Sequence, residues 1–483
     1  MSDSLQPKHK SWTAIASLAA GPVAAAIILI TNPLHTDIAI TRMTACTVWM
    51  ILWWLLEAVP ISITSLLPLI LFPVFQILNA KTTATHYIHS VSFLYLGTAF
   101  LAKTIEKTEL HKHCIERFFG YLKHNSFLLY IGLVLITAFC SMWLSNTATA
   151  LIMIPLTLSL FRNDITPQQK AGLALLIAYS ANIGGMMSLV GTGPNLVFSH
   201  LWSSYFPNEP DIGLFDWFKL SLPIGITILF SMFLYLVWQF KLNTLPNISN
   251  TFASPSKSIS FSADQKSSAF IFTITLFLWL TRKYFINSGQ GWGPWFPDAD
   301  DATIAMFAAF LCFCWPSFNH TADTSPHSKR LLTLQDIKES PWDILMLIGG
   351  GFALGAGFQS TGFDQWVAQQ FSQLSFSEPW QLLAGLTSGM SLLTEVTSNV
   401  TSTQVLLPIV AQLQNNYDLP PMIAMIGVTM SASFAFMLPI ATPPNAIAYG
   451  TGHLSIQQMI CAGFWLNLLS VLIITIALSM MTT

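Results

Sequence analysis

The sequence has few charged residues for its length. Of 483 residues, 20 are Lys or Arg and 22 are Asp or Glu, so charged residues make up 9%, against about 25% in a typical soluble domain. Hydrophobic residues make up 53%. So few charges cannot cover the surface of a soluble protein this large. The composition therefore excludes a soluble enzyme or a disordered chain and indicates a polytopic membrane protein.

Basic charge and cysteine are scarce as well. The formal net charge is -2, so no polycationic face is available to bind a nucleic-acid backbone. The 6 cysteines lie mostly within apolar runs, where a thiol packs as a small hydrophobic group. Their spacing predicts neither a disulfide framework nor a metal site.

Long apolar segments are what the chain has in abundance. Eleven are candidate membrane spans: 13–30, 43–58, 60–78, 91–104, 172–200, 216–240, 268–286, 301–316, 342–361, 421–448 and 455–481. The first is longer than the hydrophobic region of a signal peptide, so we predict that it is retained. The sequence thus predicts an all-α membrane protein with about 11 transmembrane helices.

Two further stretches, 126–160 and 380–413, do not fit one span or two. Each is roughly 35 residues long, whereas one span needs about 20 and two need about 40 plus a turn. Each also has a polar centre, Ser145-Asn146-Thr147 in one and Ser398-Asn399 in the other. Irregular backbone at membrane depth is tolerated only inside the protein or beside a cavity. We therefore predict two re-entrant helical hairpins that meet the substrate path.

The distribution of basic residues agrees with this topology. With the N-terminus in the cytoplasm and both hairpins returning to their own side, the outer segments hold Arg42, Lys81, Lys219, Arg282 and Lys283, and the other Lys and Arg face the cytoplasm. This is the expected positive-inside bias. If 126–160 crossed the membrane once, later basic residues would change side and the bias would be lost. The C-terminus is then predicted outside.

The chain contains an internal duplication. Ser141–Pro155 resembles Thr394–Pro408 at an offset of 253, and Gly191–Asn195 resembles Ala441–Asn445 at an offset of 250. In the predicted topology the two halves have opposite orientations. Inverted repeats of this kind are typical of secondary transporters.

Two polar segments lie between the apolar ones. Residues 241–266 are rich in Ser, Asn, Thr and Pro and are predicted to be a flexible cytoplasmic linker between the halves. Residues 103–124 mix charged and apolar side chains, and we predict an amphipathic helix at the cytoplasmic interface.

The two polar centres offer neutral oxygen atoms. Hydroxyl, amide and freed backbone carbonyl oxygens suit Na⁺, whereas calcium would call for several carboxylates and zinc for His or Cys. Each hairpin also directs a helix N-terminus at the midplane, and the prolines after Gly191-Thr192 and Ala441-Thr442 break two long helices and create further ends. Such a site holds cations on carbonyls and an anion on N–H groups and hydroxyls.

Basic side chains are missing where an anion would bind. No Lys or Arg occurs in 124–161, 171–218, 380–413 or 421–483. The charge of an anionic substrate would have to be offset by bound Na⁺ and helix dipoles, which couples the two fluxes. Cross-helix hydrogen bonding is the ordinary role of Ser, Thr and Asn in membrane helices, but the duplication at constant offset favours a binding site.

Three other polar residues have weaker claims to a role. Glu57 and Glu395 lie in apolar surroundings, either as protonatable coupling groups or, as we favour, as helix-end and capping residues. His200 lies near a helix end without an evident partner. No nucleophile–base pair or metal cluster falls within the spans, so the sequence does not indicate an enzyme.

These residues make the sequence resemble the divalent anion/sodium symporter family, which handles di- and tricarboxylates and sulfate. The matching features are the paired Ser-Asn hairpins, the two Thr-x-Pro-Asn breaks and Trp53-Trp54-Leu-Leu-Glu57-Ala-Val-Pro60. The resemblance implies a homodimer in a bacterial inner membrane, with a scaffold domain and an elevator-like transport domain in each protomer.

The resemblance also implies domain boundaries. Residues 1–124 would form scaffold helices and the interfacial helix, and 125–240 the first half of the transport domain. Residues 241–266 would be the linker, 267–378 the scaffold helices of the second half, and 379–483 the second half of the transport domain.

By motif position, the resemblance implies two sodium sites and a substrate site. The first sodium site would use Ser141, Ser145, Asn146 and Gly191, and the second Thr394, Thr397, Asn399 and Ala441. The substrate would meet Ser145, Asn146, Thr147, Thr192, Ser398, Asn399, Val400, Thr442 and Pro443. The implied function is Na⁺-coupled uptake of a small divalent anion, most simply a C4-dicarboxylate such as succinate.

One position departs from the pattern. Val400 stands where many carboxylate transporters have Thr, so one hydroxyl donor is lost. Sulfate or a tricarboxylate therefore remains an alternative substrate. A sodium-independent dicarboxylate exchanger of the same fold and a proton-coupled carrier that uses Glu57 or Glu395 are alternative mechanisms.

Overall fold

The computed structural model describes residues 9–33, 35–122, 126–160, 165–244, 261–283, 291–318, 330–371, 378–413 and 419–481. Within these ranges the chain forms α-helices and two short 3-10 helices, and no described residue lies in a β-strand. The predicted all-α fold is therefore confirmed.

The first half of the chain forms twelve labelled α-helices. They are α1 (His9–Thr31), α2 (Ile38–Leu55), α3 (Ile61–Thr64), α4 (Leu67–Val74), α5 (Ala80–Thr85), α6 (Ser90–Lys107), α7 (Leu110–Leu122), α8 (Ser126–Ser141), α9 (Asn146–Leu160), α10 (Pro167–Met186), α11 (Gly193–Tyr205) and α12 (Leu214–Gln239).

The second half continues the same alternation of long and interrupted helices. Its helices are α13 (Ala263–Thr281), α14 (Asp301–Cys314), α15 (Leu334–Lys338), α16 (Trp342–Thr361), α17 (Phe363–Phe371), α18 (Pro379–Leu393), α19 (Asn399–Gln412), α20 (Pro421–Ser431), α21 (Pro443–Gly450) and α22 (Ile456–Ser479). The 3-10 helices η1 (Leu242–Thr244) and η2 (Gly293–Trp295) lie in connections.

Several helices are long and apolar enough to cross a membrane. Among the described residues these segments are Ala14–Thr31, Ile38–Leu55, Ala80–Lys107, Leu214–Gln239, Trp342–Thr361 and Ile456–Ser479. Other predicted spans are shorter or interrupted helices, so the total of about 11 crossings stays a prediction. The chain is an integral membrane protein with several spans.

The two unusual stretches each fold as a helix, a turn and a second helix. In the first, α8 ends at Ser141 and α9 begins at Asn146. In the second, α18 ends at Leu393 and α19 begins at Asn399. The predicted spans 172–200 and 421–448 are each broken in the middle, since α10 and α11, and likewise α20 and α21, are separate helices.

Two predicted segments differ in detail from the structure. The span 60–78 is divided into α3 and α4, with Pro60 before the first helix and Pro68 in the first turn of the second; proline disfavours a helical residue before it and donates no backbone hydrogen bond. The amphipathic helix predicted over 103–124 begins later, because α6 continues to Lys107 and α7 starts at Leu110. Most of the predicted linker, residues 245–260, lies outside the described residues.

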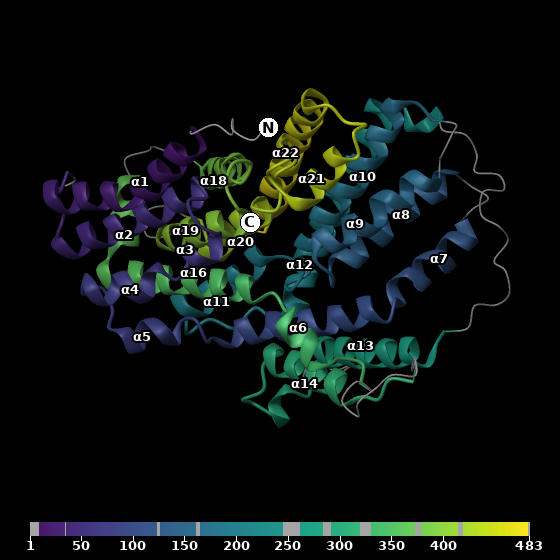
Figure 1. Ribbon diagram of the computed structural model, residues 1–483, viewed down its shortest axis with the longest axis horizontal. Helices are drawn as coiled ribbons and strands as arrows, with labels where there is room; N and C mark the ends of the chain where they lie inside the picture. Colours follow the sequence, from purple (N-terminus) through teal and green to yellow (C-terminus); the bar gives the residue numbers. More distant parts are fainter. Residues whose placement is uncertain are drawn as a thin grey trace, which may run out of the picture.

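Helix α10 forms the centre of the fold. Its residues from Ala171 to Met186 are all buried, and α10 packs against α8, α9, α12 and α21. Figure 1 shows α8, α9 and α10 above α6, with α13 and α14 along the lower edge. Contacts between α10 and α21 join the two repeats at the point where both long helices break.

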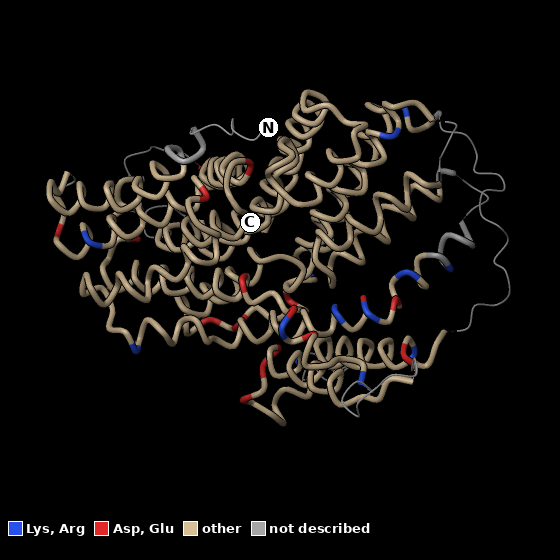
Figure 2. Tube along the Cα trace, viewed as in Figure 1, with Lys and Arg blue, Asp and Glu red and all other residues tan. Residues whose placement is uncertain are grey.

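The charged residues avoid the helices of the two hairpins and breaks. The helices α8, α9, α11, α18, α19, α20, α21 and α22 contain no Lys, Arg, Asp or Glu. Figure 2 shows the coloured charges along α6 and α7 and at loops and helix ends, whereas α8 to α12 are almost entirely tan. The uncharged part of the molecule is thus the part that contains the predicted site.

Candidate functional site

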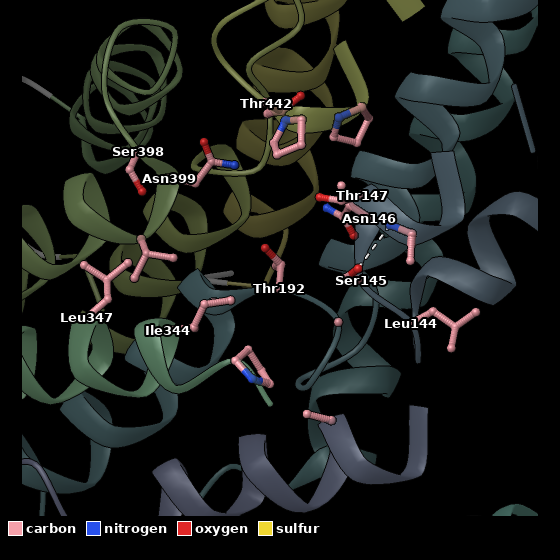
Figure 3. Close-up of a pocket in the computed structure, with 18 of the residues that line it drawn as sticks. Leu144, Ser145, Asn146, Thr147, Thr192, Ile344, Leu347, Ser398, Asn399 and Thr442 are labelled. Atoms are coloured by element: carbon pink, nitrogen blue, oxygen red, sulfur yellow. Dashed lines mark hydrogen bonds between the residues drawn. The ribbon is translucent and has the colours of Figure 1, made fainter. Parts of the chain in front are cut away.

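The tips of the two hairpins line one cavity. Its volume is about 730 Å³, and its lining includes Ser145, Asn146 and Thr147 from the first tip and Ser398, Asn399 and Val400 from the second. Figure 3 shows the two tips on opposite sides, with Thr192 and Thr442 between them. The structure therefore brings together residues that lie about half the chain apart in sequence.

Almost all of the residues implied by the resemblance lie at this cavity. Gly191, Thr192, Thr397, Ala441, Thr442 and Pro443 also line it. Ser141 and Thr394 do not; both are fully buried and lie directly behind the tips. Their hydroxyl groups contact the tip asparagines.

Each of the two tips contains the same kind of hydrogen bond. Ser141 Oγ donates to Asn146 Oδ1 at 2.7 Å, and Thr394 Oγ1 donates to Asn399 Oδ1 at 2.6 Å. The four residues occupy equivalent places in the repeat. Each hydroxyl fixes the rotamer of its asparagine and keeps lone pairs of its own. The same neutral oxygen pair is thus built twice.

The helices that follow the tips direct their N-termini at the cavity. Helix α9 begins at Asn146, and Ser145 Oγ accepts a 3.1 Å hydrogen bond from the backbone N–H of Ala148. Ser398 precedes α19 but makes no capping bond with its side chain. Unpaired N–H groups and the helix dipole favour negative charge at such ends, so both tips suit an anionic group.

At each helix break, an asparagine side chain donates hydrogen bonds to the backbone carbonyl groups. In the first break, Asn195 Nδ2 donates to the carbonyl oxygens of Met186 at 3.1 Å and Ser188 at 2.7 Å. In the second, Asn445 Nδ2 donates to the carbonyl oxygens of Ala435 at 2.7 Å and Leu438 at 3.1 Å. Each amide satisfies carbonyl groups that the interruption of the helix leaves without their usual partners. The breaks are therefore fixed parts of the fold.

A threonine precedes the second helix of each break in the same conformation. Thr192 has φ -149° and ψ 149°, and Thr442 has φ -142° and ψ 149°. Neither side chain caps its helix. Both residues line the cavity, so their hydroxyl groups are available to a ligand there.

Glycine lets the first tip approach the first break. A Cβ atom on Gly185 would lie 2.4 Å from Asn146 Oδ1, and one on Gly191 would lie 2.4 Å from the carbonyl oxygen of Gly185. A larger residue at either place would push the tip asparagine or the break out of position. Asn146 and Gly191 are thereby held close to Gly185, and Ser141 is bonded to Asn146.

Five charged residues line the cavity, and all but the buried Asp336 are partly or fully exposed. They are Glu57, Lys103, Glu106, Asp336 and Glu339. Lys103 lies 3.3 Å from Glu339, with both side chains partly exposed, and Lys107 lies 2.8 Å from Asp336. Lys103 therefore faces a carboxylate at the mouth, and among the described residues the tips and breaks have no basic side chain beside them.

The pair of Lys107 and Asp336 connects α6 to α15. Asp336 also accepts hydrogen bonds from the backbone N–H of Thr333 at 2.6 Å and its hydroxyl at 2.8 Å. Burial alone would raise the pKa of the Asp336 carboxyl, but the bonds from Lys107 and Thr333 outweigh burial and lower this pKa below its ordinary value. The carboxylate is a fixed anion that holds α15 at the cavity mouth.

The two isolated glutamates have different surroundings. Glu57 lines the cavity in the turn after α2, with φ 45°. Glu395 is buried, and its carboxylate accepts bonds from the backbone N–H groups of Met437 at 2.9 Å and Leu438 at 3.0 Å. Glu395 thus holds the second break.

His200 has partners that the sequence did not reveal. Its ring stacks on Phe352 at a centroid distance of 3.6 Å and meets the edge of the His89 ring at 4.2 Å. His200 does not line the cavity. It joins α11 to α16 and to the start of α6.

Some residues of the cavity are not indicated by the motifs in the sequence. Asn182, near the C-terminal end of α10, lines it and contacts the second break. Ile344 and Leu347 of α16 form an apolar wall (Figure 3). A lone asparagine in an apolar helix is a signal that could have identified Asn182, whereas the apolar wall has no such signal.

The chain as a whole is similar to known transporters. The family model described as "Citrate transporter" (CitMHS) matches residues 51–419 and 302–483. The sodium-dependent dicarboxylate transporter SdcS of Staphylococcus saprophyticus is 33% identical over 447 residues, which cover 89% of this chain and 84% of that protein. SdcS of Staphylococcus aureus is 32% identical over 445 residues, with the same shares of each chain covered.

Two solved structures share the fold. MtrF of Neisseria gonorrhoeae has a TM-score of 0.57 at 12% identity, and 82% of each chain is covered. The YdaH transporter of Alcanivorax borkumensis has a TM-score of 0.54 at 12% identity, with 83% of this chain and 87% of that chain covered. At this identity the likeness concerns the arrangement of helices alone.

Proposed function

The chain belongs to the citrate transporter family, CitMHS, and we propose that it couples Na⁺ entry to the uptake of a small divalent anion. It is a transporter and not an enzyme, and its resemblance to the divalent anion/sodium symporters is confirmed by its SdcS relatives. By analogy with those relatives, a C4-dicarboxylate such as succinate is the substrate we propose.

This proposal rests on a cluster of uncharged oxygen atoms that occurs once in each half of the repeat. Two tip asparagines, each with a hydroxyl partner at 2.6–2.7 Å, face one cavity with no basic side chain beside them in the described part of the chain. An anion bound there needs cations for charge balance, and hydroxyl, amide and carbonyl oxygens suit Na⁺. Binding of the dianion and of sodium would therefore be linked.

The ligands we propose follow the two halves of the repeat. One sodium ion would bind at Ser141, Ser145, Asn146 and Gly191, and a second at Thr394, Thr397, Asn399 and Ala441. The substrate carboxylates would contact the tips at Ser145, Asn146, Thr147, Ser398 and Asn399, with Thr192, Val400, Thr442 and Pro443 around them. The close approach of Asn146 to Gly185, and of Gly191 to the carbonyl oxygen of Gly185, supports the first set.

The arrangement of the protein in the membrane is also a proposal. The cavity would open to the cytoplasm, since its lining includes Lys103 of α6, which the basic-residue distribution assigns to that side. The N-terminus would be cytoplasmic and the C-terminus outside, in a bacterial inner membrane. Residues 125–240 and 379–483 would form a moving transport domain, and 1–124 and 267–378 the scaffold of a homodimer, joined through 241–266.

Uptake into proteoliposomes tests the function. An inward sodium gradient should drive accumulation of labelled succinate by the wild-type protein, and a potassium gradient should not. Asn146→Ala and Asn399→Ala should each abolish sodium-driven uptake. Asn243→Ala, an exposed asparagine outside the cavity, is the matched control and should transport normally. Full activity of both tip variants would refute the assigned sites.

A second candidate substrate is a tricarboxylate. Val400 removes a hydroxyl donor from one tip, and the matching family is described as a citrate transporter. Competition of citrate or sulfate with labelled succinate in the same proteoliposomes distinguishes these substrates. Uptake driven by internal anion and indifferent to sodium would instead indicate an exchanger.

A further inference from the structure

Asn182 connects the first repeat to the helix break of the second. It lies in α10 with 1% of its surface exposed. Its Nδ2 donates to Thr442 Oγ1 at 3.0 Å and lies 3.4 Å from Asn445 Oδ1. Asn182 and Thr442 both line the cavity. The amide therefore contacts the hydroxyl group of a residue that lines the cavity.

The orientation of this amide follows from its neighbours. Asn445 Nδ2 is used by the carbonyl oxygens of Ala435 and Leu438, so the group that Asn445 turns toward Asn182 is its oxygen. An oxygen accepts and does not donate. The group of Asn182 that faces Asn445 and Thr442 must consequently be the NH₂.

Among the described residues, the hydroxyl hydrogen of Thr442 has no acceptor. Thr442 Oγ1 receives a hydrogen bond from Asn182, and its side chain does not cap α21. A hydroxyl that accepts from one side has one hydrogen to donate elsewhere. A carboxylate oxygen bound in the cavity would accept a hydrogen bond from this hydroxyl group.

The first repeat has no such arrangement. At the offset of 250 that relates Thr192 to Thr442, the position of Asn182 corresponds to Ala432. Alanine offers no donor, so nothing at that position orients the hydroxyl of Thr192. The second repeat, which lacks a tip hydroxyl at Val400, is the one that has the oriented threonine.

We propose that Asn182 is a positioning residue that fixes the Thr442 hydroxyl as a hydrogen-bond donor to a carboxylate of the substrate. The inference rests on the proposed function and adds to it a contact on the side where Val400 provides none. Sodium is not a partner in this interaction. Loss of Asn182 should therefore weaken substrate binding and leave the cation sites as they are.

A double-mutant cycle in proteoliposomes tests the proposal. Asn182→Ala should raise the KM for succinate about five-fold, the effect of one lost hydrogen bond of ordinary strength, with the maximal rate and the sodium half-saturation at saturating succinate unchanged. Thr442→Val should do the same, and adding Asn182→Ala to it should have no further effect. In a Thr442→Ser background, which keeps the hydroxyl, Asn182→Ala should again raise the KM.

Structural damage can be separated from loss of this contact. Asn195, the counterpart of Asn445, already has an Oδ1 atom without a hydrogen-bond partner and still closes its break, so loss of the bond to Asn445 should leave the second break intact. Asn182→Ser, whose hydroxyl is too short to reach Thr442, replaces the alanine variant if that variant does not fold. Ser180→Ala, a buried change in the same helix whose hydroxyl bonds to the carbonyl of Leu176, should leave the KM unchanged.

The possible outcomes distinguish this inference from the proposed function. Equal effects of Asn182→Ala with and without the Thr442 hydroxyl would overturn it, and so would a changed sodium half-saturation at constant KM. Wild-type uptake that does not depend on sodium would contradict the proposed function. Sodium-driven uptake whose KM is unaffected by Asn182→Ala would contradict this inference alone.

Discussion

The side-chain amide of Asn467 in α22 donates a 2.7 Å hydrogen bond to the carboxylate of Glu395 in the turn of the second hairpin. The same carboxylate accepts from the backbone N–H groups of Met437 and Leu438. One buried acceptor thus joins the hairpin, the second break and the last helix. The equivalent position of the first hairpin is Met142, so only the second repeat is held in this way.

Replacing Glu395 should destabilise the protein without changing how transport is coupled. Glu395→Gln puts an NH₂ group against a donor and leaves a buried hydrogen-bonding group unsatisfied, at a cost of about 1–3 kcal/mol. The midpoint of thermal unfolding should fall by a few degrees, whereas Glu378→Gln, at an exposed carboxylate, should not lower it. A loss of pH-dependent uptake at unchanged stability would instead favour a proton-coupling role.

The approach of Asn146 to Gly185 makes a glycine necessary there. In Gly185→Ala the new Cβ atom would lie 2.4 Å from Asn146 Oδ1 and displace a proposed sodium ligand. We expect the half-saturation concentration for sodium to rise about ten-fold or more, as when the support of a metal ligand is removed. Gly389→Ala, where no atom lies within 4 Å of the new Cβ, is the control. Unchanged sodium dependence in Gly185→Ala would remove Asn146 from the sodium site.

Val400 should determine how strongly the second tip binds a carboxylate. Its side chain is partly exposed at the cavity, so a hydroxyl introduced there does not have to be buried without a partner. Val400→Thr should lower the KM for succinate about five-fold, which is the effect of gaining one hydrogen bond of ordinary strength. Val400→Ala shortens the side chain without adding a donor and should not lower the KM. A KM for succinate that does not fall in Val400→Thr would mean that the substrate does not reach this position.

The ion pair of Asp336 should contribute stability only where its carboxyl is ionised. The pKa of Asp336 is lowered in the folded protein, so its contribution is present above the unfolded value of about 3.9 and is lost as the pH falls through the folded value. Asp336→Asn should unfold at a lower temperature than the wild type at pH 7. The difference should shrink below about pH 4.

Thermal unfolding of both proteins over this pH range checks the prediction. Asp298→Asn, at an exposed aspartate, should match the wild type at every pH. A difference between Asp336→Asn and the wild type that stays constant down to acidic pH would assign the effect to packing of α15 and not to the charge.

Sequence patterns predicted the parts of the molecule that depend on local chemistry and on the duplication. Length and polar centres identified 126–160 and 380–413, and the constant offset paired their tips before any contact was known. Prolines after Thr192 and Thr442 gave the places where two long helices break. Each of these features depends on residues that are close together in the sequence, so it can be recognised without a structure.

Contacts across the repeats could not be predicted in the same way. Asn182 and Thr442 are 260 residues apart, and neither type of residue identifies its partner. The donors to Glu395 lie on α22 and at the second break, and the sequence around Glu395 does not indicate either of them. The division of 60–78 into two helices depends on prolines whose effect competes with a long apolar pattern.

The central claim is that sodium and a dianion bind together at the two hairpin tips. The most direct measurement is the thermal stability of the purified protein with succinate in sodium or in potassium, since a ligand stabilises in proportion to its occupancy. We predict stabilisation by succinate in sodium alone, and its loss in Asn146→Ala and Asn399→Ala. Equal stabilisation in potassium, or stabilisation that survives in both variants, would contradict the account.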